Sequence, residues 1–169
     1  MKRNGAILLL LMAVLAPIAL GGAQVNAKAA GARRTLKVKL NYTGAGVVDE
    51  KHQIYVLLFD ANPYTALSLI DATSQPTPPT PAPGVAHILT RQGTAAKDGI
   101  VSFRELRVSP VFAAAFFDKD GTSNGQLEGA SKVPMGVYGK LPDKLEPIKV
   151  EPGKTTQVAL TFDDSTTTP

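Results

Sequence analysis

Residues 36–42 read Leu-Lys-Val-Lys-Leu-Asn-Tyr, and this stretch decides the expected fold. Its apolar and polar side chains alternate, so that one face carries Leu36, Val38, Leu40 and Tyr42 and the other carries Lys37, Lys39 and Asn41. Successive side chains of a β-strand point to opposite faces, which gives a period of two. We therefore predict a half-buried strand whose second face meets water.

Further strand-like stretches follow along the chain. Residues 52–60 are apolar on both faces and rich in strand formers, which predicts a central strand. Residues 111–117 contain three alanines, which favour helix, but the run is short and is bounded by a proline and an Asp-x-Asp-Gly turn, so we expect a buried strand. Strand patterns recur at residues 86–89, 100–106, 148–150 and 155–162, whereas residues 66–70 suit either a short turn of helix or a packed loop.

These strands define one expected domain, over residues 33–163. About seven short strands separated by turn residues, with no convincing long helix, predict an all-β fold: a single antiparallel β-sandwich of immunoglobulin-like type. Residues 73–84 carry five prolines and cannot lie inside a sheet, so we interpret them as an insertion, either a polyproline-like spacer or a loop. Residues 164–169 form a polar tail that we expect to fray.

The first residues have the three parts of a secretory signal. A positive start at Lys2 and Arg3 precedes a short apolar run, and small residues follow it. The run is shorter than the roughly 20 residues that cross a bilayer, and Pro17 interrupts it. We predict a cleaved signal peptide at residues 1–23, a flexible segment at 24–32, and a periplasmic or secreted protein with no stable membrane span.

Charge and cysteine content exclude several classes of protein. The chain has no cysteine, which leaves nothing to acylate for a lipid anchor and no disulfides for stability. Loss of Lys2 and Arg3 with the signal lowers the basic residues from 18 to 16 against 14 acidic ones, a net charge of +2. Because no basic patch interleaved with aromatic residues is present, we do not expect nucleic acid as a partner.

One segment, residues 116–129, has the composition of a site. Directly after the expected strand it places five oxygen-bearing side chains among glycines: Asp118, Asp120, Thr122, Asn124 and Glu128. Calcium takes six to eight oxygen ligands from flexible loops of this kind. The helix-loop-helix calcium pattern is not met, because the sixth and twelfth positions from Asp118 are Ser123 and Gly129. The alternative is a turn whose Asp and Asn side chains bond to their own backbone.

The same segment carries a resemblance. Asp118-Lys119-Asp120-Gly121 with Asn124-Gly125-Gln126-Leu127-Glu128, followed by residues 133–139, resembles a family of exported bacterial proteins of unknown function, with transthyretin-like or carboxypeptidase-regulatory-like sandwiches and a D-x-N-x-N-G-x-L-D loop. The likeness covers residues 97–140. Phe117 stands where that family has histidine, and the proline-rich insertion is additional. The resemblance implies a transthyretin-like sandwich, as the alternative to an immunoglobulin-like one, and an exported location, but no activity.

Two functions from different classes compete at this point. The first is a non-enzymatic binding or accessory module of the cell envelope, whose partner is a protein, an envelope polymer or a carbohydrate. Its Asp118–Glu128 loop would be stabilised by calcium if an ion is bound. The second is a metal-dependent hydrolase that uses Asp118, Asp120 and His87, and it requires these three groups to lie together. We expect the non-enzymatic module, because no sequence motif of a known catalytic site is present.

Overall fold

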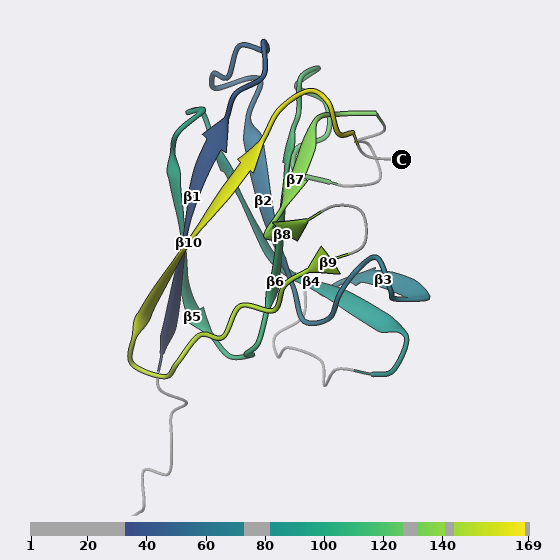
Figure 1. The fold of residues 1–169 in the computed structure, drawn as a ribbon, viewed down its shortest axis with the longest axis vertical. Coiled ribbons are helices and arrows are strands. Elements are labelled where there is room, and N and C mark those ends of the chain that lie inside the picture. The colour runs from purple at the N-terminus through teal and green to yellow at the C-terminus, as the bar shows by residue number, and fades with distance from the viewer. Residues whose placement is uncertain (1–32, 73–81, 127–131, 141–143, 168–169) are drawn as a thin grey trace, which may run out of the picture.

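Two β-sheets packed face to face form the main body of the part of the protein that the structure describes (Figure 1). The computed structural model describes residues 33–72, 82–126, 132–140 and 144–167. The strands are β1 (Arg34–Tyr42), β2 (Ile54–Phe59), β3 (Ser68–Asp71), β4 (Val85–Thr94), β5 (Ile100–Leu106), β6 (Phe112–Phe117), β7 (Met135–Val137), β8 (Gly139–Lys140), β9 (Lys144–Leu145) and β10 (Thr155–Phe162). The predicted signal peptide, the 24–32 segment and most of the proline-rich insertion lie outside the described residues.

The predicted all-β sandwich is confirmed. One sheet has the order β10-β1-β5, the other β3-β4-β2-β6-β7, and β8 with β9 forms a separate two-stranded ribbon. The expectation that all pairing is antiparallel is wrong, since β1 pairs with β10, and β3 with β4, in parallel. Parallel neighbours need a long connection, about a dozen residues or more. Residues 72–84 provide that length between β3 and β4, and most of the domain lies between β1 and β10.

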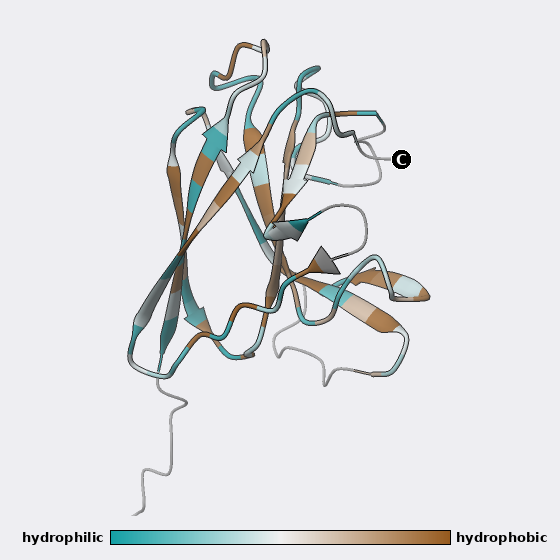
Figure 2. Ribbon diagram, in the orientation of Figure 1, coloured by the Kyte–Doolittle hydropathy of each residue, from teal (hydrophilic) through white to brown (hydrophobic). Residues whose placement is uncertain are grey.

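The buried side chains of β1 form part of the core between the two sheets. Leu36, Val38, Leu40 and Tyr42 are all buried there, while the lysines between them are exposed, as predicted. Val56 from β2 and Phe103 from β5 belong to the same apolar cluster. Figure 2 shows the resulting alternation of apolar and polar bands along β1. This cluster is the main core of the domain.

Strand β2 has apolar contacts on both of its faces. Ile54, Val56 and Leu58 face the other sheet, whereas Leu57 and Phe59 belong to a second cluster on the outer face of the five-stranded sheet. That cluster also includes Val133 and Leu145, so the segments around β7 and β9 cover this face. The predicted central strand is thereby confirmed as β2. The predicted buried strand is confirmed as β6, which pairs with β2 on the side opposite β4.

Several local expectations are corrected. Residues 68–71 form the edge strand β3, where a turn of helix or a loop was expected. Residues 148–150 make no strand, because only one isolated bridge, between Val111 and Ile148, joins them to a neighbour. Strand β4 runs to Thr94, five residues beyond the predicted end. The described residues contain no helix, and hence none long and apolar enough to span a membrane.

The polar tail is anchored where fraying was expected. Thr166 O accepts a hydrogen bond from Met135 N at 2.9 Å, and Thr167 forms a bridge with Pro134. Asp164 accepts hydrogen bonds from the Tyr42 hydroxyl and from Ala45 N. The tail up to Thr167 is therefore held against the segment around β7 and the end of β1.

The hydrogen bond from the Tyr42 hydroxyl to Asp164 leads us to expect a loss of stability at high pH. Burial and the neighbouring Asp164 carboxylate raise the pKa of the Tyr42 hydroxyl from 10.0 to about 12. Since the folded protein holds this proton more tightly than the unfolded chain, the stabilisation is complete below pH 10 and is lost as the pH rises through 12. Urea denaturation between pH 9 and 12 should show this decline. The decline should be shallower in Tyr42→Phe, and an identical slope in both proteins would contradict the assignment.

A second prediction concerns Gly136 in β7. A Cβ atom there would lie 2.5 Å from Phe162 Cβ and 2.9 Å from Leu160 Cδ2, so β7 approaches β10 too closely for any side chain. We expect Gly136→Ala to lower the free energy of unfolding by about 1–3 kcal/mol through overpacking. Gln157→Ala, at an exposed position of β10, should change it by less than about 0.5 kcal/mol. Equal denaturation midpoints for the two variants would refute this close-packing argument.

Candidate functional site: a polar groove beside the sandwich core

The predicted ion-binding loop begins at a buried carboxylate. Asp118 is 3% exposed and directly follows β6, where its backbone N donates to Gln53 O at 2.9 Å. Its two carboxylate oxygens accept hydrogen bonds from the loop itself, Oδ1 from Thr122 N at 3.2 Å and Oδ2 from Ser123 N at 3.0 Å. The side chain thus bonds to its own backbone, which was the alternative to an ion site.

The remaining predicted ligands that the structure describes differ from Asp118 in burial. Asp120, Thr122 and Asn124 have exposed side chains, and Glu128 lies outside the described residues. Asn124 has a φ of 49°, a turn conformation that asparagine tolerates. Within the described part of the chain, no three His, Cys, Asp or Glu side chains are grouped to hold a metal ion.

The loop also packs against the five-stranded sheet. Gly125 has a φ of 79°, and a Cβ atom on it would lie 2.7 Å from the Tyr55 ring. Gly125 O accepts a long hydrogen bond, 3.5 Å, from Arg91 Nη1. The loop therefore contacts both β2 and β4 through Gly125.

The two histidines are paired with carboxylates at different places. His87 Nδ1 lies 2.7 Å from Asp60 Oδ2, and the side chains are 8% and 0% exposed. His52 Nδ1 lies 2.9 Å from Asp49 Oδ1 in an exposed loop. Because Asp60 follows β2 and Gln53 precedes it, the Asp60–His87 pair and Asp118 are at opposite ends of β2, roughly 20 Å apart. The structure does not bring together the three groups of the predicted hydrolase site.

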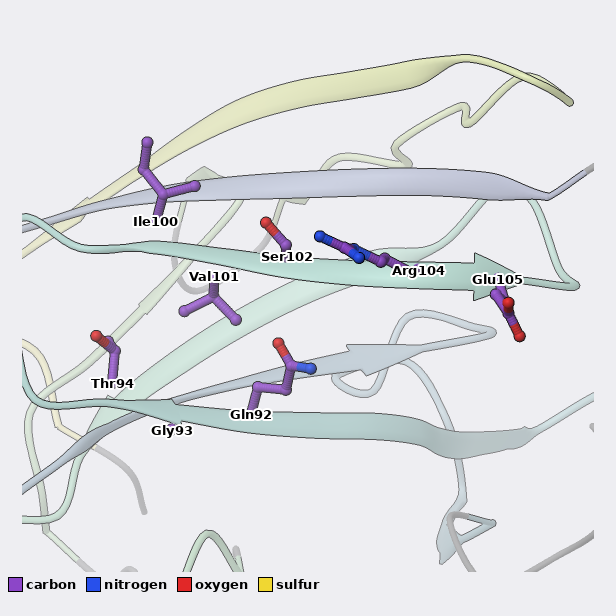
Figure 3. A pocket seen from close by; sticks show the side chains of 8 residues that line it. All are labelled: Gln92, Gly93, Thr94, Ile100, Val101, Ser102, Arg104 and Glu105. Atoms are coloured by element: carbon purple, nitrogen blue, oxygen red, sulfur yellow. The ribbon is translucent and has the colours of Figure 1, made fainter.

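A groove lies where β4 and β5 pass each other at the open side of the sandwich (Figure 3). Its volume is about 610 Å³. The lining residues are Gln92, Gly93, Thr94, Ile100, Val101, Ser102, Arg104 and Glu105. Both walls are strand edges in the described structure, since β5 is the last strand of its sheet and β3 pairs with β4 only up to Ile88.

Polar residues occupy core-facing positions in this groove. Gln92 pairs with Val56, and Thr94 with Ile54, across an antiparallel ladder. Directly paired residues share a face, so Gln92 and Thr94 point to the inter-sheet side on which Ile54 and Val56 are buried. The core therefore stops at this edge, and neutral hydrogen-bonding side chains take its place.

The backbone of β5 adds further hydrogen-bonding groups. Gly99 O accepts from Leu40 N, and Lys97 O accepts from Tyr42 N, so alternate odd-numbered residues bond to β1. In an antiparallel pair the residues between them direct N–H and C=O away from that partner. Ile100 and Ser102 thus present their backbone groups to the open side.

Two charged residues, Arg104 and Glu105, lie at one end of the groove, and only Glu105 forms an ion pair within the described residues. Glu105, at a φ of 61° where the β1–β5 register shifts, forms an ion pair of 3.3 Å with Arg33. Arg104 is exposed, and none of the ion pairs of the described residues includes it. The groove consequently offers neutral donors and acceptors along its length and a cation at its end.

Sequence reasoning missed this groove. The available signal was the run Thr90, Gln92 and Thr94, which keeps period two after the apolar part of β4 ends. A strand that becomes polar on its inner face indicates where a sandwich stops being closed.

Comparisons with protein-family models, with curated proteins and with solved structures found no match for this chain. The resemblance of residues 97–140 to a family of exported bacterial sandwiches therefore stays a prediction.

The hydrogen bonds of Asp118 give a stability prediction. Asp118→Ala should lower the free energy of unfolding by about 3 kcal/mol, because it leaves the Thr122 and Ser123 amides without their charged acceptor. Asp118→Asn, which keeps one carbonyl oxygen, should lose about half as much. Chemical denaturation checks both values.

Calcium separates the two interpretations of this loop. If the loop is held by its own hydrogen bonds, millimolar calcium should leave the Tm of the chelator-treated protein unchanged. A calcium-dependent rise in Tm that Asp120→Ala abolishes would contradict this interpretation and establish an ion site.

Proposed function

We propose that this protein is an exported, non-enzymatic binding module of the cell envelope, located in the periplasm or secreted. The β4–β5 groove holds an extended chain that bears hydroxyl and amide groups. The observation that carries this proposal is the replacement of core side chains by Gln92 and Thr94 at the open side of the sandwich. The signal-like N-terminus supports the location, and the resemblance to an exported family agrees with it.

The chemistry of the groove favours binding over catalysis. Gln92 supplies both a donor and an acceptor, and the Thr94 and Ser102 hydroxyls can do either. These groups suit the many hydroxyls and amides of a glycan or another envelope polymer. Neither histidine lines the groove, and each is already paired with an aspartate. Among the groove residues, Ser102 therefore has no histidine beside it, the general base that most often activates a serine nucleophile.

Glycan binding tests the proposal, with chitohexaose as a neutral probe that bears hydroxyls and amides. Titration into the ¹⁵N-labelled protein should give saturable NMR shifts at Gly93, Ile100 and Ser102. Gln92→Leu should weaken this binding about tenfold, since it removes a donor and an acceptor that the ligand uses. Gln126→Leu, the same change at an exposed loop position, is the matched control. Shifts elsewhere only, or equal affinity for the two variants, would refute the groove as the binding site.

A further inference from the structure

The outer face of the three-stranded sheet carries an unpaired positive charge. The polar side chains of β1 that alternate with its buried ones are Lys37, Lys39 and Asn41, and all three are exposed. Lys37 lies between Ser102 of β5 and Gln157 of β10, and Lys39 lies between Ile100 and Ala159. We call the exposed outer surface of these three strands the basic face.

Arg104 extends this charge toward the groove. It lies two positions after Ser102 along β5, so both belong to the outward-directed positions of that strand, and both also line the groove. In Figure 3 the Ser102 and Arg104 side chains lie on the opposite side of β5 from Val101, which points toward β4. The basic face and the groove thus meet along β5.

The positive charges on this face are not neutralised within the described residues. No ion pair there involves Lys37, Lys39 or Arg104. Strands β1 and β10 contain no carboxylate, and the only one in β5, Glu105, is bound by Arg33. Asp98 and Asp163 lie beyond the ends of β5 and β10, at the end of the sheet where Tyr42 lies. The cations therefore dominate the central part of the face.

The spacing of these groups fits a repeating chain. Residues two apart on one face of a strand are separated by roughly 7 Å, and neighbouring strands by roughly 5 Å. Small hydrogen-bonding side chains, Ser102 and Gln157, flank Lys37 on either side. Lys39, two positions further along β1, lies between Ile100 and Ala159. Cations at this spacing, with hydroxyl and amide groups beside one of them, match a polymer that alternates carboxylates with hydroxyls.

Other anionic partners match this face less well. Single-stranded nucleic acids stack their bases on aromatic side chains, and the outward-directed positions of β1, β5 and β10 include none. Binding to a lipid surface needs a substantial apolar face, and Ile100, 55% exposed, is the one large apolar side chain exposed on these strands.

We propose that the basic face binds an acidic glycan, one with a carboxylate on its sugar units, and that this chain continues into the β4–β5 groove. This inference rests on the proposed function and narrows its ligand from any hydroxyl-bearing chain to a uronate-bearing one. Lys37, Lys39 and Arg104 contact the carboxylates, while Ser102, Gln157 and Gln92 contact the hydroxyls.

Hexagalacturonic acid is the probe, with chitohexaose as its neutral counterpart. Calorimetric titration of the purified protein should show tighter binding of the acidic hexamer, and its affinity should fall as the salt concentration rises. Lys37→Gln combined with Lys39→Gln should weaken hexagalacturonate about tenfold and leave chitohexaose unchanged. The control is Lys51→Gln with Lys119→Gln. It removes the same charge from two exposed residues in loops next to β2 and β6 of the other sheet, and it should leave the affinity for hexagalacturonate unchanged.

The outcomes separate the inference from the function on which it rests. Binding of chitohexaose but not of hexagalacturonate overturns the acidic-glycan inference and leaves the groove function standing. Equal loss in both double variants also overturns it, because net charge alone would then explain the binding. Failure of both hexamers to bind overturns the proposed function as well. Tighter binding to phosphatidylglycerol vesicles than to hexagalacturonate, lost in Lys37→Gln with Lys39→Gln, would assign the face to a lipid surface.

Discussion

The burial of β2 on both of its faces is the constraint on which the structure depends. One set of its side chains completes the core between the sheets, and the other set supports the cluster on the outer face. Because β4 and β6 pair with β2, the positions of the Asp118 loop and of the Asp60–His87 pair follow from its two ends. A strand about 20 Å long therefore separates the two groups of polar residues that the sequence suggested could act together.

The two sides of the sandwich, where the edges of the sheets meet, differ in how closely their strands pack. On one side β7 packs onto β10 so closely that only glycine fits at position 136, and the tail bonds to β7 through Thr166. On the other side β4 and β5 diverge over polar side chains and leave the groove. The proposed ligand chain would enter at this second side and continue around β5 onto the basic face.

Much of the fold could be predicted from local pattern, and the rest depends on tertiary pairing. The period of two in residues 36–42 identified the buried face of β1, and the apolar run at 52–60 identified the central strand, since both signals lie within one strand. Strand β3 is wholly exposed and has no such period, so its parallel pairing with β4 could not be deduced. The Asp118 loop was recognised by its composition, but its carboxylate bonds are made to backbone amides, which composition does not reveal. The groove could not be predicted from local pattern, because it is lined by β4 and β5, which belong to different sheets.

The parallel pairing of β1 with β10 has a mechanical consequence. β1 begins at the end of the sheet where β10 also begins, so the chain enters the ladder at one end with Thr35 and leaves it at the other with Phe162. Tension between the two ends of the chain would pull these neighbouring strands past each other lengthwise. The hydrogen bonds between them would then bear the load together and not open one after another, as they would if the strands were peeled apart from one end. Tension along the chain would thus have to break the whole β1–β10 ladder at once before the sandwich could unravel.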